Sequence, residues 1–165
     1  MKTLNQYIQE KLIINKDYSD GKMYHPKSFD ELRKIIEDRY DKLGPGTKQN
    51  PIDFNDIDVS NLNSFCNDND KGIFEKTKFK YIDISSWDVS NVTNMTRMFC
   101  WCKELESIGD ISKWDVSKVN SMIHMFFDCK KFNQDISNWD VSNVMGRVGM
   151  FYGCPIKNEY EPKFK

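Results

Sequence analysis

The stretch IDISSWDVSNVTNMTRMFCWC (82–102) recurs twice more, as GDISKWDVSKVNSMIHMFFDC (109–129) and QDISNWDVSNVMGRVGMFYGC (134–154). The tryptophans of the three copies are 27 and then 25 residues apart. A period of this length is typical of repeat architectures, in which one short supersecondary unit stacks on copies of itself. We therefore expect an extended surface rather than a pocket in which unlike catalytic residues converge.

Each copy predicts a strand, a turn and a short helix. Residues 84–87 alternate apolar and polar side chains, as a half-buried strand does. Residues 88–91 (DVSN) follow, and short polar side chains of this kind start turns by bonding nearby backbone groups. Apolar residues then recur with the spacing of one helix face: Val92, Met95, Met98, Phe99 and Cys102.

A degraded copy over 56–74, with about five extra residues in its helix half, precedes the other three. We number the copies in chain order, so that 56–74 is the first repeat and 134–154 the fourth. The sequence predicts an α/β fold, a leucine-rich-repeat-like solenoid of about four strand–turn–short-helix coils with an α-helical N-terminal cap. The domains expected are a helical cap and linker (1–50), a repeat solenoid (51–154) and a C-terminal tail (155–165).

The cap has its own helix signals. Ser28-Phe-Asp-Glu31 is a capping box, and Gly44-Pro-Gly46 ends the helix that it starts. A second helix is expected over 3–14. The apolar face of the helix that starts after Ser28 is predicted to consist of Leu32, Ile35, Ile36, Arg39, Tyr40 and Leu43.

Composition excludes several classes of partner. The formal net charge is −1, so no strong field attracts nucleic acid or an anionic membrane. No stretch approaches the roughly 20 apolar residues that a membrane helix requires, and the N-terminus lacks the apolar region of a secretory signal. We expect a cytoplasmic protein as the chain is written, or a cell-surface protein if a leader was removed.

No catalytic, cofactor or metal site is expected. The chain has five cysteines. Cys102, Cys129 and Cys154 occupy the same position in three successive repeats, and we call such a set of equivalent positions a column. A column of cysteines favours buried free thiols. Cys100 and Cys102 lack the two-residue spacer of a zinc motif. A disulfide between stacked cysteines remains an alternative.

Two further columns have alternative interpretations. The aspartates Asp88, Asp115 and Asp140 could bind calcium, although one Asp per copy before Val-Ser is better explained by turn formation. The tryptophan column could stack on sugars or bases, although the isoleucine three residues earlier favours a place in the core.

The phrase FNQDISNWDVSNV followed by MF and GC, over 132–154, resembles the BspA-like leucine-rich repeat family, also called the bacterial surface protein repeat family. The resemblance covers about 56–154. It implies the solenoid fold and an interaction module, with adhesion and host-protein binding as the usual roles. Relatives in phages and mobile elements are also implied.

We therefore expect a non-catalytic scaffold for protein–protein interactions, monomeric, with an unidentified protein partner. One alternative is a bacterial surface adhesin that binds host protein or glycan. Another is a phage or mobile-element protein that inhibits a host or defence protein by surface binding. Bulky or charged residues that interrupt the repeat mark the candidate interaction surface: Arg97, Trp101, Lys113, Lys118, His124, Phe127 and Tyr152.

Overall fold

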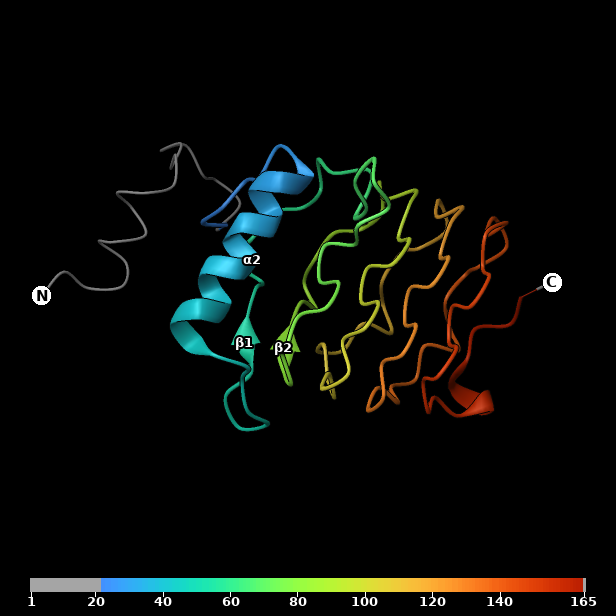
Figure 1. Ribbon diagram of the computed structural model, residues 1–165. Coiled ribbons are helices and arrows are strands. Elements are labelled where there is room, and N and C mark those ends of the chain that lie inside the picture. The colour runs from blue at the N-terminus through green and yellow to red at the C-terminus, as the bar shows by residue number, and fades with distance from the viewer. Residues whose placement is uncertain (1–21, 165) are drawn as a thin grey trace, which may run out of the picture.

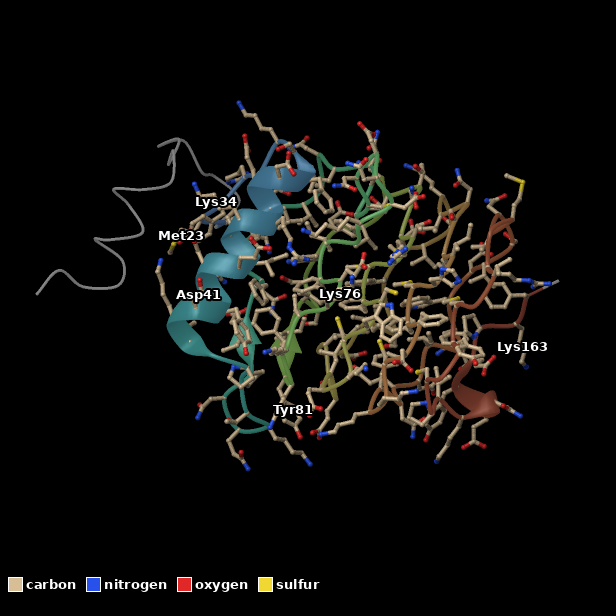
Figure 2. All side chains as sticks on the ribbon, in the orientation of Figure 1. Met23, Lys34, Asp41, Lys76, Tyr81 and Lys163 are labelled. Carbon is tan, nitrogen blue, oxygen red and sulfur yellow. The ribbon has the colours of Figure 1, made fainter. Side chains whose placement is uncertain are left out.

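A computed structural model describes residues 22–164 of the chain. Figure 1 shows one α-helix lying across one end of a row of backbone turns, with the C-terminus at the other end. The helix expected over 3–14 lies outside the described residues. Figure 2 shows the same arrangement with side chains, with Met23 and Lys34 at the helix end and Lys163 at the opposite end.

Helix α2 spans Phe29–Leu43, and its ends form as the sequence predicts. The hydroxyl of Ser28 accepts a hydrogen bond from the N–H of Glu31 over 3.3 Å. The carboxylate of Glu31 accepts a hydrogen bond over 2.8 Å from the N–H of Lys27, one residue before the N-cap whose N–H a capping box would bind. Gly44 ends the helix at φ 73°, a backbone conformation that suits glycine.

One face of α2 packs on the first repeat. Leu32, Ile35 and Ile36 are buried in the common hydrophobic core. The predicted apolar face is wrong at its C-terminal end, because Leu43 is 49% exposed. The helix therefore packs on the repeats as far as Tyr40, whose ring meets that of Phe79 edge-on at 5.0 Å, and only its last residues leave them.

Successive repeats lie side by side in parallel. Strand β1 (Ile52–Asp53) pairs with strand β2 (Ile82–Asp83), with Ile52 opposite Ile82. Isolated parallel bridges continue this alignment from Asn94 to Ser121 and from Ser121 to Gly146. These bridges join equivalent positions of the repeats, so residues of one column lie next to one another.

The predicted fold class is wrong. The described residues contain one α-helix, two parallel strands of two residues each and a short 3-10 helix, η1 (Asn158–Tyr160). This is a small mixed α/β protein and not a solenoid of strand–turn–short-helix coils. The strand expected over 84–87 is a turn, closed by a 3.1 Å hydrogen bond from the N–H of Trp87 to the carbonyl of Ile84.

The helix expected over 92–102 is a run of tight turns. An α-helix would bond each N–H to the carbonyl four residues earlier. Instead, the N–H of Arg97 donates to Ile123 (2.8 Å) and that of Phe99 to Met125 (2.9 Å), both in the third repeat. The amide between them closes a turn, from Met98 to the carbonyl of Met95 (3.2 Å). Because Arg97 has φ 56°, a right-handed helix cannot pass through it.

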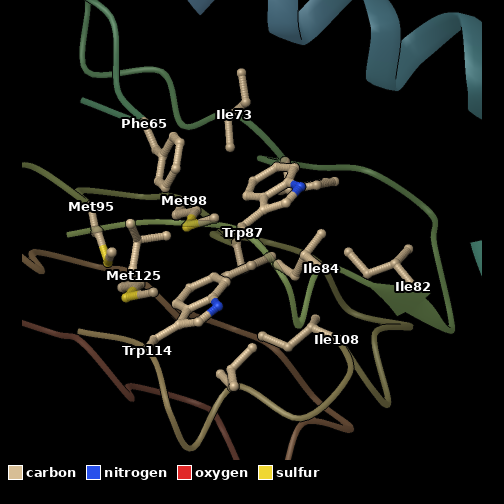
Figure 3. Packing of buried hydrophobic residues seen from close by; sticks show 14 of the residues in the cluster. Phe65, Ile73, Ile82, Ile84, Trp87, Met95, Met98, Ile108, Trp114 and Met125 are labelled. Atoms are coloured by element: carbon tan, nitrogen blue, oxygen red, sulfur yellow. The ribbon is translucent and has the colours of Figure 1, made fainter. Parts of the chain in front are cut away.

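The core nevertheless consists of the predicted columns. Figure 3 shows Trp87 and Trp114 pointing into the same core as Met98 and Met125. The indole N–H of Trp87 donates to the carbonyl of Phe54 over 2.9 Å, which satisfies its polar atom inside the core. The column residues that are buried are Ile84, Ile111, Ile136, Trp87, Trp114, Trp139, Met98, Phe99, Met125, Phe126 and Met150.

Candidate functional site

Three aromatic side chains form a continuous strip on the outside of the turns. The ring centroid of Trp101 lies 5.3 Å from that of Phe127, which in turn lies 5.1 Å from that of Tyr152. The imidazole of His124 meets the ring of Phe127 edge-on at 5.1 Å. We call these four residues the aromatic stripe. Trp101 is 37% and Tyr152 69% exposed, so the stripe offers large apolar surface to solvent.

The backbone beneath the stripe is in the left-handed region. Trp101 has φ 63° and His124 has φ 54°, and Arg97 shares this conformation. A non-glycine residue held there costs about 1–3 kcal/mol. The fourth repeat has glycine at both equivalent positions, Gly149 (φ 63°) and Gly153 (φ 70°). The second and third repeats thus carry side chains where the backbone favours glycine.

Charged groups border the stripe. The ammonium group of Lys103 lies 5.1 Å from the ring centroid of Trp101, a cation–π contact. The same ammonium is 3.8 Å from the carboxylate of Asp128, which also pairs with Lys130. Asp128 is buried between two exposed lysines. The stripe is therefore an apolar surface bordered by a cluster of charges, a combination found in protein interfaces.

The other three predicted site residues make their side-chain contacts elsewhere or are exposed. Arg97 is bound to the first repeat, since its guanidinium holds the carboxylate of Glu75 through bonds of 2.8 and 3.2 Å. Lys118 donates to the side chain of Asn91 over 3.0 Å, and Lys113 is exposed. Both lysines belong to the turns around the buried tryptophan of the third repeat. The structure thus brings together Trp101, His124, Phe127 and Tyr152 out of the seven.

Sequence reasoning missed two apolar residues of the fourth repeat. Met145 is 86% and Val148 71% exposed. The sequence contains a signal for Val148, because its column reads Thr96, Ile123, Val148 and becomes apolar towards the C-terminus. The exposed apolar surface therefore grows along the repeats.

The aspartate column forms turns, as the sequence favours. The carboxylate of Asp115 accepts from the N–H of Ser117 over 3.1 Å and from its hydroxyl over 2.6 Å. The equivalent Asp88 accepts from the N–H of Ser90 over 3.0 Å. Among residues 22–164, no group of three His, Cys, Asp or Glu side chains is placed to hold a metal ion.

The thiols are poorly suited to nucleophilic chemistry. All five cysteines are free, and only Cys154 is more than slightly exposed. Burial raises the pKa of Cys102 to about 12 and that of Cys100 to about 11. Each is therefore protonated at neutral pH, whereas the thiolate is the reactive form.

A hollow lies at the other end of the molecule, between α2 and the β1 region. It encloses about 590 Å³ and is lined by Met23, Ile35, Leu43 and Ile52, among others. At its wall the guanidinium of Arg39 binds the carboxylate of Asp56 through bonds of 2.7 and 3.0 Å. This ion pair joins the helix to the first repeat.

A comparison with protein families gives a match that covers the repeats. The family described as "Mycoplasma protein of unknown function, DUF285" matches residues 49–162. The chain belongs to the DUF285 family. The DUF285 segment contains all four repeats and the whole aromatic stripe, while α2 lies before it. No curated protein and no solved structure matches the chain.

The part of the chain that the structure describes contains no helix long and apolar enough to cross a bilayer.

Proposed function

We propose that this protein is a non-catalytic binding module that holds another protein through the aromatic stripe. The observation that carries the proposal is the contact series Trp101–Phe127–Tyr152, with centroid separations of 5.3 and 5.1 Å. Rings fixed against one another lose little side-chain freedom on binding, which is why aromatic residues dominate the energetics of interfaces.

Backbone strain supports the same site. Residues held in left-handed conformations persist where the surrounding structure enforces them, and such residues concentrate at functional sites. Trp101 and His124 have this conformation, although glycine occupies the equivalent places in the fourth repeat. A large side chain at such a position is therefore better explained by binding than by stability.

The resemblance of the repeats to the BspA-like family supports a binding role, because that family is associated with protein interaction and adhesion. The protonated thiols support the absence of chemistry. We propose a protein partner in preference to nucleic acid because the net charge is −1.

Affinity purification with the immobilised protein tests the proposal. Trp101→Ala with Tyr152→Ala removes two exposed rings and should leave the thermal melting nearly unchanged. Lys113→Ala with Lys118→Ala is the matched control in the turns on either side of Trp114. We expect a protein that is recovered by the wild type and the lysine control and depleted with the stripe variant. Equal recovery with the stripe variant would contradict the proposal.

A further inference from the structure

The outer edge of the fourth repeat has a row of backbone donors without acceptors. The N–H groups of Arg147, Gly149, Phe151 and Gly153 make no hydrogen bond to any described residue. The amides between them close turns, as from Met150 to the carbonyl of Arg147 over 3.2 Å. We call these four N–H groups the donor edge. All four of its residues are at least partly exposed to solvent.

In the earlier repeats the equivalent donors are all bound. In the third repeat, the N–H of His124 donates to Val148 over 3.0 Å, and that of Asp128 to Tyr152 over 2.7 Å. The remaining two, Met122 and Phe126, donate to carbonyls of the fourth repeat over 2.7 and 2.9 Å. Every second amide therefore points towards the C-terminal end of the row and every matching carbonyl towards the N-terminal end. The donor edge lacks only the next set of carbonyls.

The opposite end of the row is capped. One guanidinium nitrogen of Arg33, on α2, donates to the carbonyls of Ile73 (2.7 Å), Gly72 (3.3 Å) and Glu75 (3.3 Å). Ile73 and Glu75 are the first-repeat equivalents of Met98 and Cys100, whose carbonyls bind the preceding repeat. Arg33 thus uses two of the carbonyls that could complement the donor edge of a second copy, and α2 lies across that end of the row (Figure 1). Two donor edges facing each other would place N–H against N–H, so a second copy does not fit either way.

The chain itself shows what does fit. Its own C-terminal segment follows the strand side of the fourth repeat, where the N–H of Ile136 donates to the carbonyl of Tyr160 over 3.0 Å. This segment is no repeat, yet it supplies the carbonyl that a further repeat would supply. On the turn side the same segment places the ring of Phe164 4.8 Å from the guanidinium of Arg147, but it gives no carbonyl to the four N–H groups of the donor edge.

We propose that the donor edge binds a polypeptide segment of another protein, which supplies backbone carbonyls to the four N–H groups. The occupant follows from complementarity, since a row of donors with partial positive charge requires a row of acceptors. Addition of a segment to an unpaired edge is a known mode of peptide recognition. The half-buried ring of Phe151 and the exposed side chain of Val148 lie along the same edge, so the segment also needs apolar side chains. The choice of a protein as partner rests on the proposed function. Tyr152 of the aromatic stripe lies between two residues of the donor edge, so one partner could contact both surfaces.

Amide NMR on the full-length protein tests this, with a synthetic peptide of residues 118–128 (KVNSMIHMFFD) as probe. This peptide contains the carbonyls of Ser121, Ile123, Met125 and Phe127, which bind the donors of the second repeat. A scrambled peptide of the same composition is the control. At about 1 mM peptide, where even a weak site is half occupied, we expect shifts and slowed exchange at the four amides of the donor edge. Smaller changes are expected at Met150 and Tyr152, whose N–H groups are already bound.

Arg147→Pro removes one donor and should weaken peptide binding about two- to tenfold, with thermal melting as the check on folding. Trp101→Ala should leave the peptide-induced changes at the donor-edge amides as they are in the wild type. The experiment can therefore refute binding at the donor edge independently of binding at the aromatic stripe. Unperturbed edge amides at this concentration, or equal effects of the scrambled peptide, would overturn the proposal. Edge amides that shift with the concentration of the protein alone would also overturn it, because a second copy would then be the occupant.

Discussion

The ring of Phe126 stacks on the ring of Phe99, with centroids 5.3 Å apart and planes 11° from parallel. The stack continues to Phe74 on one side and to Phe151 on the other, at 5.3 and 5.8 Å. One column of the repeat thus runs through the middle of the core. Such stacking fixes the register of neighbouring repeats as well as burying apolar area.

Truncating the middle of this stack should cost more than truncating its end. Phe126 is fully buried and also stacks on Phe132 at 4.2 Å, whereas Phe151 is half-buried. Phe126→Ala should lower the free energy of unfolding by about 3–5 kcal/mol through loss of burial and an unfilled cavity. Phe151→Ala should cost less. Urea denaturation of both variants measures the difference, and equal costs would contradict this account of the packing.

Native thiol reactivity should follow burial. The thiols of Cys102 and Cys129 are buried and donate to the carbonyls of Phe74 and Phe99, both over 3.0 Å. Cys154 is half-buried, and burial raises its pKa to about 11. Alkylation at pH 8 followed by mass spectrometry should modify Cys154 first and the other two only on unfolding. A Cys102–Cys129 disulfide in protein kept under reducing conditions, or equal labelling rates, would be evidence against this packing.

Stability should fall in acid through the aspartate turns. Hydrogen bonds from Ser112 and Ser117 lower the pKa of Asp110 and Asp115 below the ordinary 3.8, and the backbone N–H and hydroxyl of Ser137 do the same for Asp135. A lowered pKa in the folded state adds stability above pH about 4, and this stability is lost as the pH falls through the lowered values.

Replacing all three aspartates by asparagine keeps an acceptor in each turn and removes its titration. The urea midpoint of this variant should depend less steeply on pH between 5 and 2.5 than that of the wild type. Asp41→Asn, on the exposed side of α2, is the matched control. An unchanged acid dependence in the triple variant would show that these turns do not couple to folding.

Arg33 should stabilise the protein as a cap on the first repeat. Arg33→Ala leaves the carbonyls of Gly72, Ile73 and Glu75 without their shared donor, and we expect a loss of about 1–3 kcal/mol. Lys34→Ala, one residue further along α2 and exposed, should change stability by less than about 0.5 kcal/mol. Glu37→Ala removes the 2.6 Å pair of Glu37 with Arg33 and keeps the carbonyl contacts. Urea melts in which Arg33→Ala matched Lys34→Ala would exclude the capping role.

The sequence correctly predicts which columns form the core. It wrongly predicts a strand and a helix within each repeat, where the structure has turns. Spacing that places Val92, Met95 and Met98 on one side suits both a helix and a run of tight turns. What decides is the backbone at Arg97 and Trp101, which is left-handed, and neither residue type indicates that. The only signal is the glycine at the same positions of the fourth repeat, Gly149 and Gly153.

The candidate site was predictable only in part from deviations in the repeated sequence. Deviations from the repeat identify Trp101, His124, Phe127 and Tyr152, which the structure brings together. Deviation alone does not separate a free charge from a paired one, so Arg97 was included although Glu75 holds it. The donor edge has no sequence signal, because it arises from backbone groups at the end of the row.

The affinity of the purified partner for two matched variants tests the central claim most directly. Titration calorimetry should show at least about thirtyfold weaker binding to the variant with Trp101→Ala and Tyr152→Ala, which corresponds to the loss of about 2 kcal/mol at an interface hot spot. Lys113→Ala with Lys118→Ala should stay within about threefold of the wild type, as expected for rim charges. Wild-type affinity in the stripe variant, with binding lost in the lysine variant, would contradict the account.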